Sequence, residues 1–402
     1  MLTLDAALAR LLEAVRPLEA IERVSTFDAL GRVLAQDVVS LLDVPPADNT
    51  SMDGYALRAG DVPAAGTVLP VSQRIPAGVV GAPLLKGTAA RISTGAQVPA
   101  GADAVVMQEH CAMVEGGVRV DVVPQAGQWV RRQGEDVQRG SVVLPRGTKL
   151  TPQALGLAAS VGAATLEVVR RPRVGLLSTG DELVMPGEPL RPGAIYNSNR
   201  FTLRALVAAA GCDCEDLGIV PDSLGATRDA LRRAAADCDL VVSCGGVSVG
   251  EEDHLRPAVQ AEGRLDLWQV AIKPGKPLAF GELRRATGSH AWFIGLPGNP
   301  VSSFVTFFLA VRPVLLRLQG AGTQPPAAIA ARADFDWPKP DRRREFLRVR
   351  RNAEGGLELF GNQSSGVLTS TVWGDGVVDN PGGQAIRRGD VVRYLPFAEL
   401  VA

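Results

Sequence analysis

The sequence predicts a multidomain α/β plus β protein, and three observations lead to this expectation. The chain has 402 residues, more than the roughly 250 to 300 at which a single hydrophobic core stops growing. From residue 173 onward, short apolar runs alternate with helical patterns, which indicates an α/β domain. Residues 45–140 and 329–402 are short strand-like pieces separated by Gly and Pro, which indicates β-rich parts before and after it.

The α/β domain is expected to run from residue 173 to near Gly320. Strands that alternate with helices of this length imply right-handed crossovers and a parallel sheet covered on both faces. Ligands of open α/β sheets bind outside the carboxyl ends of the strands, so we expect the loops there to line one crevice. The expected strands are 173–177, 216–220 and 239–243, and the expected helices are 199–210 and 226–236.

A further helix is expected after the turn at 297–300. Val301, Phe304, Val305 and Phe308 follow helical spacing, and Pro313 is expected to kink or stop the helix.

The flanking segments complete the expected organisation. Residues 1–16 carry an amphipathic helical pattern, and residues 152–161 are helical or apolar, so the two could pack together as a separate layer. Pro325 and Pro326 mark a linker, and 354–356 is a hairpin signal in the terminal β part.

The overall composition narrows the class of protein. Hydrophobic residues make up 46% and charged residues 21%, as in folded soluble proteins, and the net charge of -1 gives no general attraction to nucleic acid or anionic lipid. The amino terminus lacks the apolar core of a signal peptide, and the apolar run at 301–310 is shorter than a membrane span. We therefore expect a cytoplasmic protein. The five cysteines are odd in number without C-x-x-C spacing, which favours reduced thiols over disulfides or a zinc site.

A Gly-rich loop at 243–250 follows the apolar strand at 239–243. Its backbone N–H groups, together with the start of a helix near Asp253, could bind an anion such as phosphate. A tight strand-to-helix turn without a ligand is the alternative interpretation. The loop fits neither a P-loop nor a dinucleotide-binding pattern.

Acidic residues stand beside this loop at the ends of the expected strands. Mg²⁺ is usually held by one or two carboxylates together with phosphate oxygens of a substrate, so a metal and phosphate site is expected here. Each carboxylate taken singly could instead be a solvated charge or a helix cap. The acidic residues are Asp181, Glu182, Asp222, Glu251, Glu252 and Asp253.

Two more segments could hold a phosphate. Lys273 and Lys276 lie in a rigid Pro/Gly frame and could clamp it with two ammonium groups, although a basic turn is the alternative. The turn at 297–300 opens a helix whose free N–H groups could also face an anion, or serve only as a helix start. The three histidines are scattered and no H-E-x-x-H or G-x-S-x-G pattern occurs, so metal-assisted chemistry is expected.

Read in order, these loops resemble the molybdopterin molybdenumtransferase family, known as MoeA in bacteria and as the E domain of gephyrin in animals. The resemblance spans nearly the whole chain. The matching blocks are 48–56, 91–96, 99–106, 134–137, 178–183, 245–253, 272–277 and 295–301.

The resemblance implies an elongated chain with an α/β molybdopterin-binding domain, an inserted β-rich arm and a C-terminal β barrel. It implies a homodimer whose active site lies between the α/β domain of one subunit and the arm of the other. The implied domains are 1–45 plus 141–170 as a discontinuous linker and dimerisation domain, 46–140 as the arm, 171–322 as the α/β domain and 323–402 as the barrel.

The implied activity is Mg²⁺-dependent insertion of molybdate into adenylylated molybdopterin, with release of AMP, as the last step of molybdenum-cofactor synthesis. The implied partners are the molybdopterin adenylyltransferase and the proteins that mature molybdoenzymes; no nucleic acid and no membrane is expected. The alternatives are a molybdopterin adenylyltransferase of the same α/β fold and a gephyrin-like scaffold.

The site residues follow from these matches. Glu182, Asp222 and Asp253 are expected to hold the metal and take part in catalysis, and Asp53 and Asp136 are expected to be catalytic from the partner's side. The expected substrate-binding residues are Thr94, Ser178, Thr179, Gly180, Gly245, Gly246, Ser248, Gly250, Lys273, Lys276, Pro297, Gly298, Asn299, Pro300, Arg348 and Ser365.

Two positions depart from the family pattern. Gln269 stands where family members often have Lys, so one cation could be missing from the pocket. Cys244 stands where Ser or Thr is more usual, a change expected to matter little.

Overall fold

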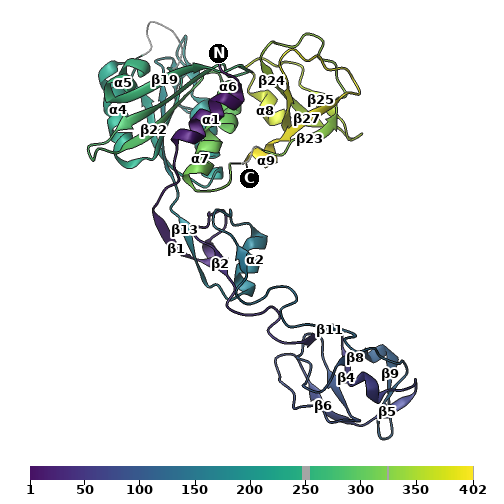
Figure 1. Cartoon of the computed structure of the whole chain (residues 1–402). Helices are drawn as coiled ribbons and strands as arrows, with labels where there is room; N and C mark the ends of the chain where they lie inside the picture. The colour runs from purple at the N-terminus through teal and green to yellow at the C-terminus, as the bar shows by residue number, and fades with distance from the viewer. Residues whose placement is uncertain (247–253, 324–325, 402) are drawn as a thin grey trace.

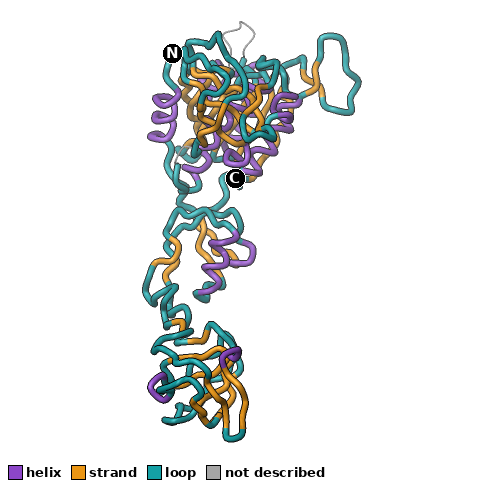
Figure 2. Tube along the Cα trace, turned by 90° about the vertical axis from the view of Figure 1, so that its right-hand side faces the viewer, coloured by secondary structure: helices purple, strands orange, loops and turns teal. Residues whose placement is uncertain are grey.

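The computed structural model describes residues 1–246, 254–323 and 326–401. The molecule is elongated, with a large head that contains both chain ends, a slender middle part and an arm at the far end (Figure 1). The view turned by 90° shows the same separation of arm and head (Figure 2). The β-rich insertion expected between residues 45 and 140 is therefore a body of its own.

A six-stranded sheet in the order β17-β14-β18-β22-β21-β19 forms the centre of the α/β part of the head. The first four strands are parallel, as expected, but β21 and β19 run antiparallel to their neighbours. The expectation of a wholly parallel sheet was therefore wrong. The seven residues between β19 and β21 are too few for the crossover that two parallel strands need. The strands are β14 (Arg173–Thr179), β17 (Asp213–Val220), β18 (Leu240–Cys244), β19 (Gly263–Gln269), β21 (Pro277–Arg284) and β22 (His290–Leu296).

Helices cover both faces of this sheet because its strands are apolar on both sides. Leu177, Val241 and Phe293 pack against α4 and α5, whereas their neighbours Leu176 and Val242 pack against the helices of the other face. The helices are α1 (Leu4–Ala14), α3 (Ser198–Ala209), α4 (Leu224–Asp237), α5 (Leu255–Glu262), α6 (Pro300–Thr306) and α7 (Arg312–Leu318).

The helix after the Pro-rich turn does not stop at Pro313. It runs on from α6 through a π-helical segment, η4 (Phe307–Val311), into α7. The wider π turn lets the chain pass a proline, which has no N–H and whose ring would crowd the preceding turn. Within the described residues, Pro300–Leu318 is long and apolar enough to cross a membrane by length and composition, but 72% of that window is buried, as in a core helix.

The middle part is built from two distant stretches of chain. β1 (Ile21–Ser25) pairs with β13 (Thr165–Val169), and β2 (Val38–Val39) pairs with β12 (Val142–Leu144). The helix α2 (Pro152–Ser160) packs on their apolar faces. The amino-terminal helix does not join this layer, contrary to expectation: α1 packs on the head, where Ala7, Leu11 and Val15 are buried.

The arm has a four-stranded and a three-stranded sheet with one apolar cluster between them, and a second apolar cluster packs on the other face of the four-stranded sheet. One sheet has the order β6-β7-β4-β8 and the other the order β5-β10-β9. The arm's elements are β3 (Asn49–Thr50), β4 (Gly54–Leu57), β5 (Thr67–Leu69), β6 (Val71–Ile75), β7 (Ala89–Ile92), β8 (Ala104–Met107), β9 (Cys111–Val114), β10 (Gly117–Val120) and β11 (Val130–Arg131), with short helices η2 (Ala59–Asp61) and η3 (Gln108–His110).

The C-terminal part is joined to the α/β part by a strand pair. β20, from the α/β part, pairs in parallel with β24 at the edge of the C-terminal sheet, and the hairpin expected at 354–356 joins β24 to β25. The remaining elements are β15 (Leu183–Val184), β16 (Ile195–Tyr196), β20 (Ile272–Lys273), β23 (Ile329–Arg332), β24 (Arg344–Arg351), β25 (Leu357–Leu359), β26 (Gly376–Asn380), β27 (Val391–Pro396), η1 (Thr26–Asp28), α8 (Thr369–Trp373) and α9 (Phe397–Val401).

Candidate functional site

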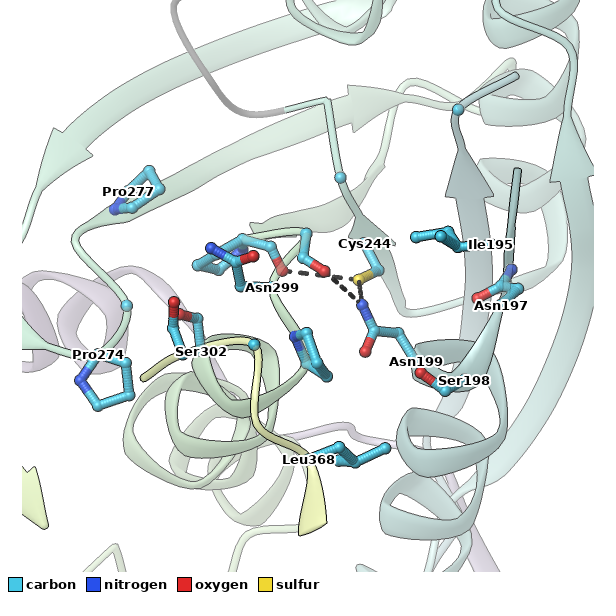
Figure 3. A pocket seen from close by; sticks show the side chains of 18 of the residues that line it. Ile195, Asn197, Ser198, Asn199, Cys244, Pro274, Pro277, Asn299, Ser302 and Leu368 are labelled. Atoms are coloured by element: carbon cyan, nitrogen blue, oxygen red, sulfur yellow. Dashed lines mark hydrogen bonds between the residues drawn. The ribbon is translucent and has the colours of Figure 1, made fainter. Parts of the chain in front are cut away.

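A cleft of about 1160 Å³ lies where the carboxyl ends of the parallel strands meet the C-terminal part. The crevice expected at this edge of the sheet is present, and most of the residues expected to bind there line it (Figure 3). The predicted residues that line the cleft are Thr179, Gly180, Glu182, Asp222, Gly245, Gly246, Lys273, Lys276, Pro297, Gly298, Asn299, Pro300 and Ser365.

Two carboxylates, Glu182 and Asp222, lie in this cleft after β14 and β17. The loop of Asp222 is tied to the loop before Glu182, because the Asp222 N–H donates to Asp181 Oδ1 at 3.4 Å. Outside 247–253, 324–325 and 402, no three His, Cys, Asp or Glu residues are grouped closely enough to hold a metal ion. Mg²⁺ is usually held by one or two carboxylates together with substrate phosphates, so Glu182 and Asp222 are of the residue type that such a site needs.

The Gly-rich loop is described only at its start. Gly245 and Gly246 have φ of +92° and +67°, a region that disfavours residues with a Cβ. A Cβ on Gly246 would also lie 2.9 Å from Leu255 Cβ, so the loop needs glycine to fit against α5. The predicted residues Ser248, Gly250 and Asp253 lie outside the described residues.

The start of α3 contributes a set of polar side chains that the sequence analysis missed. Asn199 Nδ2 donates to Gly298 O at 2.7 Å and to Cys244 Sγ at 3.1 Å (Figure 3). Asn197 caps α3 and is buried at the cleft, and its Nδ2 has no hydrogen-bond partner among the residues that the structure describes. The sequence signal was the pair Asn197 and Asn199 at the start of the helix expected at 199–210. That helix start lies at the carboxyl ends of the strands, where ligand binding was expected.

The lysines of the 273–277 loop both line the cleft but differ in their surroundings. Lys273 Nζ lies 3.2 Å from Glu345 Oε1 and 3.6 Å from Asp341 Oδ2, both in the C-terminal part. Within the described part of the chain, Lys276 makes no ion pair and its side chain is exposed. One lysine is therefore held and the other is available to an anion.

The C-terminal part supplies one wall of the cleft through Arg343 and the loop at 363–368. The Ser365 carbonyl accepts the Val301 N–H at 3.0 Å, which fixes this loop at the start of α6. Arg343 was missed. It lies within a run of arginines at 342–344, and a run by itself does not show which member faces the cleft.

The comparisons with known proteins agree over the whole length of the chain. Residues 2–162 match the MoeA N-terminal region (domain I and II), residues 175–317 a probable molybdopterin binding domain, and residues 330–397 the MoeA C-terminal region (domain IV). A molybdopterin molybdenumtransferase of Haemophilus influenzae is 39% identical, with 100% of both chains covered. The chain belongs to the molybdopterin molybdenumtransferase family.

Other relatives support the same membership. The molybdopterin molybdenumtransferase of Bacillus subtilis is 35% identical over 94% of this chain and 90% of its own length. The crystal structure of a molybdopterin biosynthesis moeA protein from Pyrococcus horikoshii has a TM-score of 0.85 at 30% identity, covering 98% of this chain and 100% of that one. The MoeA-like multidomain fold is therefore confirmed.

Two residues that the family resemblance assigned to substrate are not at the cleft surface. Ser178 is 1% exposed within β14, and it is the next residue, Thr179, that lines the cleft, because successive residues of a strand point to opposite faces. Arg348 is also 1% exposed, and its guanidinium donates to Ser364 O at 3.2 Å. Burial lowers the pKa of Arg348 to about 10. In this structure Arg348 supports the loop that carries Ser365.

The residues of the inserted segment that the family resemblance singled out are not among the described residues that line the cleft of their own chain, and the arm extends away from the head (Figure 1). Asp53, Thr94 and Asp136 are exposed. The Thr94 N–H donates to Asp53 Oδ1 at 2.7 Å and holds the pKa of that carboxyl below its ordinary value. The structure therefore groups Asp53 with Thr94 and leaves both open to a partner.

The two departures from the family pattern have different settings. Gln269 ends β19 opposite Pro277, and its side chain does not line the cleft. Cys244 does line it, and burial raises the pKa of this thiol to about 11. All five cysteines are free.

Proposed function

We propose that this chain inserts molybdate into adenylylated molybdopterin and releases AMP, in a Mg²⁺-dependent reaction. The observation that carries the proposal is the composition of the cleft. It combines two carboxylates, Glu182 and Asp222, with two lysines, Lys273 and Lys276. These residues lie at the carboxyl ends of the parallel strands, in the part of the chain that matches a probable molybdopterin binding domain. The relatives named molybdopterin molybdenumtransferase give the reaction its substrate class.

The residues of the cleft suit the cleavage of a phosphoanhydride. Such a reaction depends on neutralising charge on the phosphates and on positioning them, more than on a protein nucleophile. Lys276 would contact a phosphate directly, and Glu182 and Asp222 would hold Mg²⁺. When bound, the ion would supply charge neutralisation at the phosphate oxygens. The positive ends of the helix dipoles at the starts of α3 and α6, where Asn199 and Ser302 line the cleft, would add to the positive potential that orients the substrate.

Asn197 adds a directional contact for the substrate. Its side-chain N–H is buried without an acceptor in the described parts of the chain, and an unpaired buried donor costs free energy unless a ligand pairs with it. A carbonyl or phosphate oxygen of the substrate at this point would accept that hydrogen bond. This gives the cleft a means of orienting the substrate beyond simple charge attraction.

We propose a homodimer in which the arm of one chain reaches the cleft of the other. Asp53, Thr94 and Asp136 are not among the described residues that line the cleft of their own chain. Their exposure, on a segment that extends away from the head (Figure 1), suits residues that act on a second chain. Asp53 and Asp136 would then act in catalysis and Thr94 in binding.

We further propose a cytoplasmic setting, in which a molybdopterin adenylyltransferase supplies the substrate and molybdoenzyme-maturation proteins receive the product.

The test is a reaction assay with purified protein, adenylylated molybdopterin, molybdate and Mg²⁺. AMP release that depends on molybdate and on Mg²⁺ is the expected result. Transfer of AMP from ATP to molybdopterin would instead identify an adenylyltransferase. Binding of substrate without turnover would identify a scaffold, and either outcome would overturn the proposal.

A further inference from the structure

One wall of the cleft is tied to the C-terminal part where β20 pairs with β24. In the parallel pairing of β20 with β24, Lys273 lies opposite Glu345, so their side chains leave the sheet on the same face. Lys273 Nζ lies 3.2 Å from Glu345 Oε1. The carboxylate and the ammonium come from different parts of the chain and meet at the wall of the cleft.

Glu345 is buried, and both of its carboxylate oxygens have a partner. Its side chain is 1% exposed, and its second oxygen, Oε2, accepts the Trp337 indole N–H at 2.8 Å. A buried carboxylate is tolerated when it is paired and hydrogen-bonded, and here the paired cation is Lys273. Lys273 itself remains 40% exposed on the cleft side. The buried residue therefore anchors one that a ligand can still reach.

Asp341 provides a second anchor on the same ammonium. Its Oδ2 lies 3.6 Å from Lys273 Nζ, and the same carboxylate is held by Arg343, with an N–O distance of 2.8 Å. The Arg343 guanidinium holds the pKa of Asp341 well below its usual range, so Asp341 stays charged. Two carboxylates, those of Glu345 and Asp341, thus flank the Lys273 ammonium.

We infer that Glu345, with the support of Asp341, is a positioning residue that holds the Lys273 ammonium ready for a substrate phosphate. The inference rests on the proposed function for the identity of that phosphate. A lysine that is already fixed on folding loses little further side-chain freedom when it binds, which favours binding. Lys276, in the same loop without such an anchor, has to be ordered by the ligand.

The first measurement is the affinity of the full chain for AMP, determined by isothermal titration calorimetry. Glu345→Gln keeps an acceptor for Trp337 but turns a donor toward Lys273, and we expect about 10-fold weaker AMP binding, as for other residues that orient a binding group. Glu345→Asp keeps the charge and should recover part of the affinity. Unchanged affinity in Glu345→Gln would overturn the inference.

A pair of double-mutant cycles separates positioning from general structural support. If Glu345 acts through Lys273, Glu345→Gln has no further effect on AMP affinity in a Lys273→Met background. The same change in a Lys276→Met background keeps its full effect. Equal coupling to both lysines, or no coupling to Lys273, would contradict the inference.

The matched control is Asp379→Asn. Asp379 is 2% exposed and pairs with Arg344, which precedes Glu345 on β24 and so points to the opposite face of the sheet. This variant also breaks a buried ion pair and is expected to lower the unfolding temperature while leaving AMP affinity unchanged. An AMP affinity that falls equally in Asp379→Asn and Glu345→Gln would show that the loss comes from lower stability of the fold and not from the position of Lys273.

Two further outcomes keep the inference separate from the proposed function. AMP binding needs no turnover, so a wild-type chain that binds AMP but does not insert molybdate would overturn the proposed function alone. Should Glu345→Gln fail to fold, Asp341→Asn, whose side chain is already 25% exposed, replaces it in both cycles. Additive behaviour of Asp341→Asn with Lys273→Met would then overturn the inference.

Discussion

The cleft of the head and the tip of the arm present the expected site residues in opposite ways. In the head, loops from two parts of the chain line a cleft, and hydrogen bonds between side chains and backbone hold its loops in place. The arm is a separate body with two apolar cores of its own (Figure 2), and Asp53, Thr94 and Asp136 of the inserted segment are exposed. The head thus offers a cleft to a ligand, whereas the arm offers exposed side chains.

This difference suggests what each region contributes to the proposed reaction. A hollow lined by carboxylates and lysines can bind and orient a phosphate by itself. The exposed arm residues can act only where a second surface brings a ligand to them. Changes in the head are therefore expected to act within one chain, and changes in the arm across two.

The largest effect is expected from Asp222→Asn in the cleft. The loss of one of the two carboxylates that would hold Mg²⁺ should lower the rate of AMP release about 1000-fold, because metal neutralisation of the phosphates is worth several kcal/mol. Asp229→Asn, on the exposed face of α4, is the control and should keep wild-type activity. A rate within tenfold of wild type for Asp222→Asn would remove this residue from the metal site.

The second prediction tests whether the arm acts across chains. Asp53→Asn and Asp222→Asn should each be inactive alone, but refolding them together should restore activity. Random pairing places half of the chains in mixed dimers with one intact site out of two, so about a quarter of wild-type activity should return. If the mixture stays as inactive as its components, head and arm act within one chain and the proposed dimer site is wrong.

The same two regions show how far the sequence alone could predict the molecule. The order of strands and helices in the head followed from apolar alternation, and the cleft followed from the rule that ligands bind at the carboxyl edge. The antiparallel strands β19 and β21, the position of α1 and the π turn before Pro313 did not follow, because they depend on tertiary packing. Local patterns therefore predict elements better than they predict which body an element joins.

For site residues the limit is the direction of individual side chains. Ser178 and Thr179 are neighbours in one motif, yet only Thr179 faces the cleft. Arg348 and Arg343 lie in the same stretch, and the structure buries the first and exposes the second to the cleft. A strand's alternation fixes such choices only once its register is known.

A smaller effect is expected from Gly275→Ala in the loop that carries both lysines. Gly275 has φ of +107°, and a Cβ there would collide with Thr306 Oγ1 on α6. Displacement of the loop should destabilise the chain by about 1 to 3 kcal/mol and raise the KM of the substrate.

Gly288→Ala serves as its matched control at the other end of the sheet. Gly288 also has a positive φ, +84°, but a Cβ there meets nothing within 4 Å. This variant carries the backbone strain alone and should leave KM unchanged. Equal KM changes in both variants would show that displacement of the lysine loop has no effect of its own on KM.

The smallest expected effect concerns two cysteines, one in each region. Burial raises the pKa of Cys244 in the cleft and of Cys111 in the arm to about 11, so each has the same small thiolate fraction at pH 8. Both should react with iodoacetamide about 100-fold more slowly than a thiol of the ordinary pKa 9.0. Both rates should rise about tenfold per pH unit until the pH approaches 11.

Access then separates the two thiols. Cys111 is half-buried and should be labelled before Cys244, which is 4% exposed. Because Cys244 lines the cleft, saturating AMP should slow its labelling further and leave Cys111 unaffected, as peptide mass spectrometry can measure. If AMP protected both thiols equally, bound AMP would also shield Cys111 in the arm, and the expected independence of this thiol from the clefts of the dimer would be wrong.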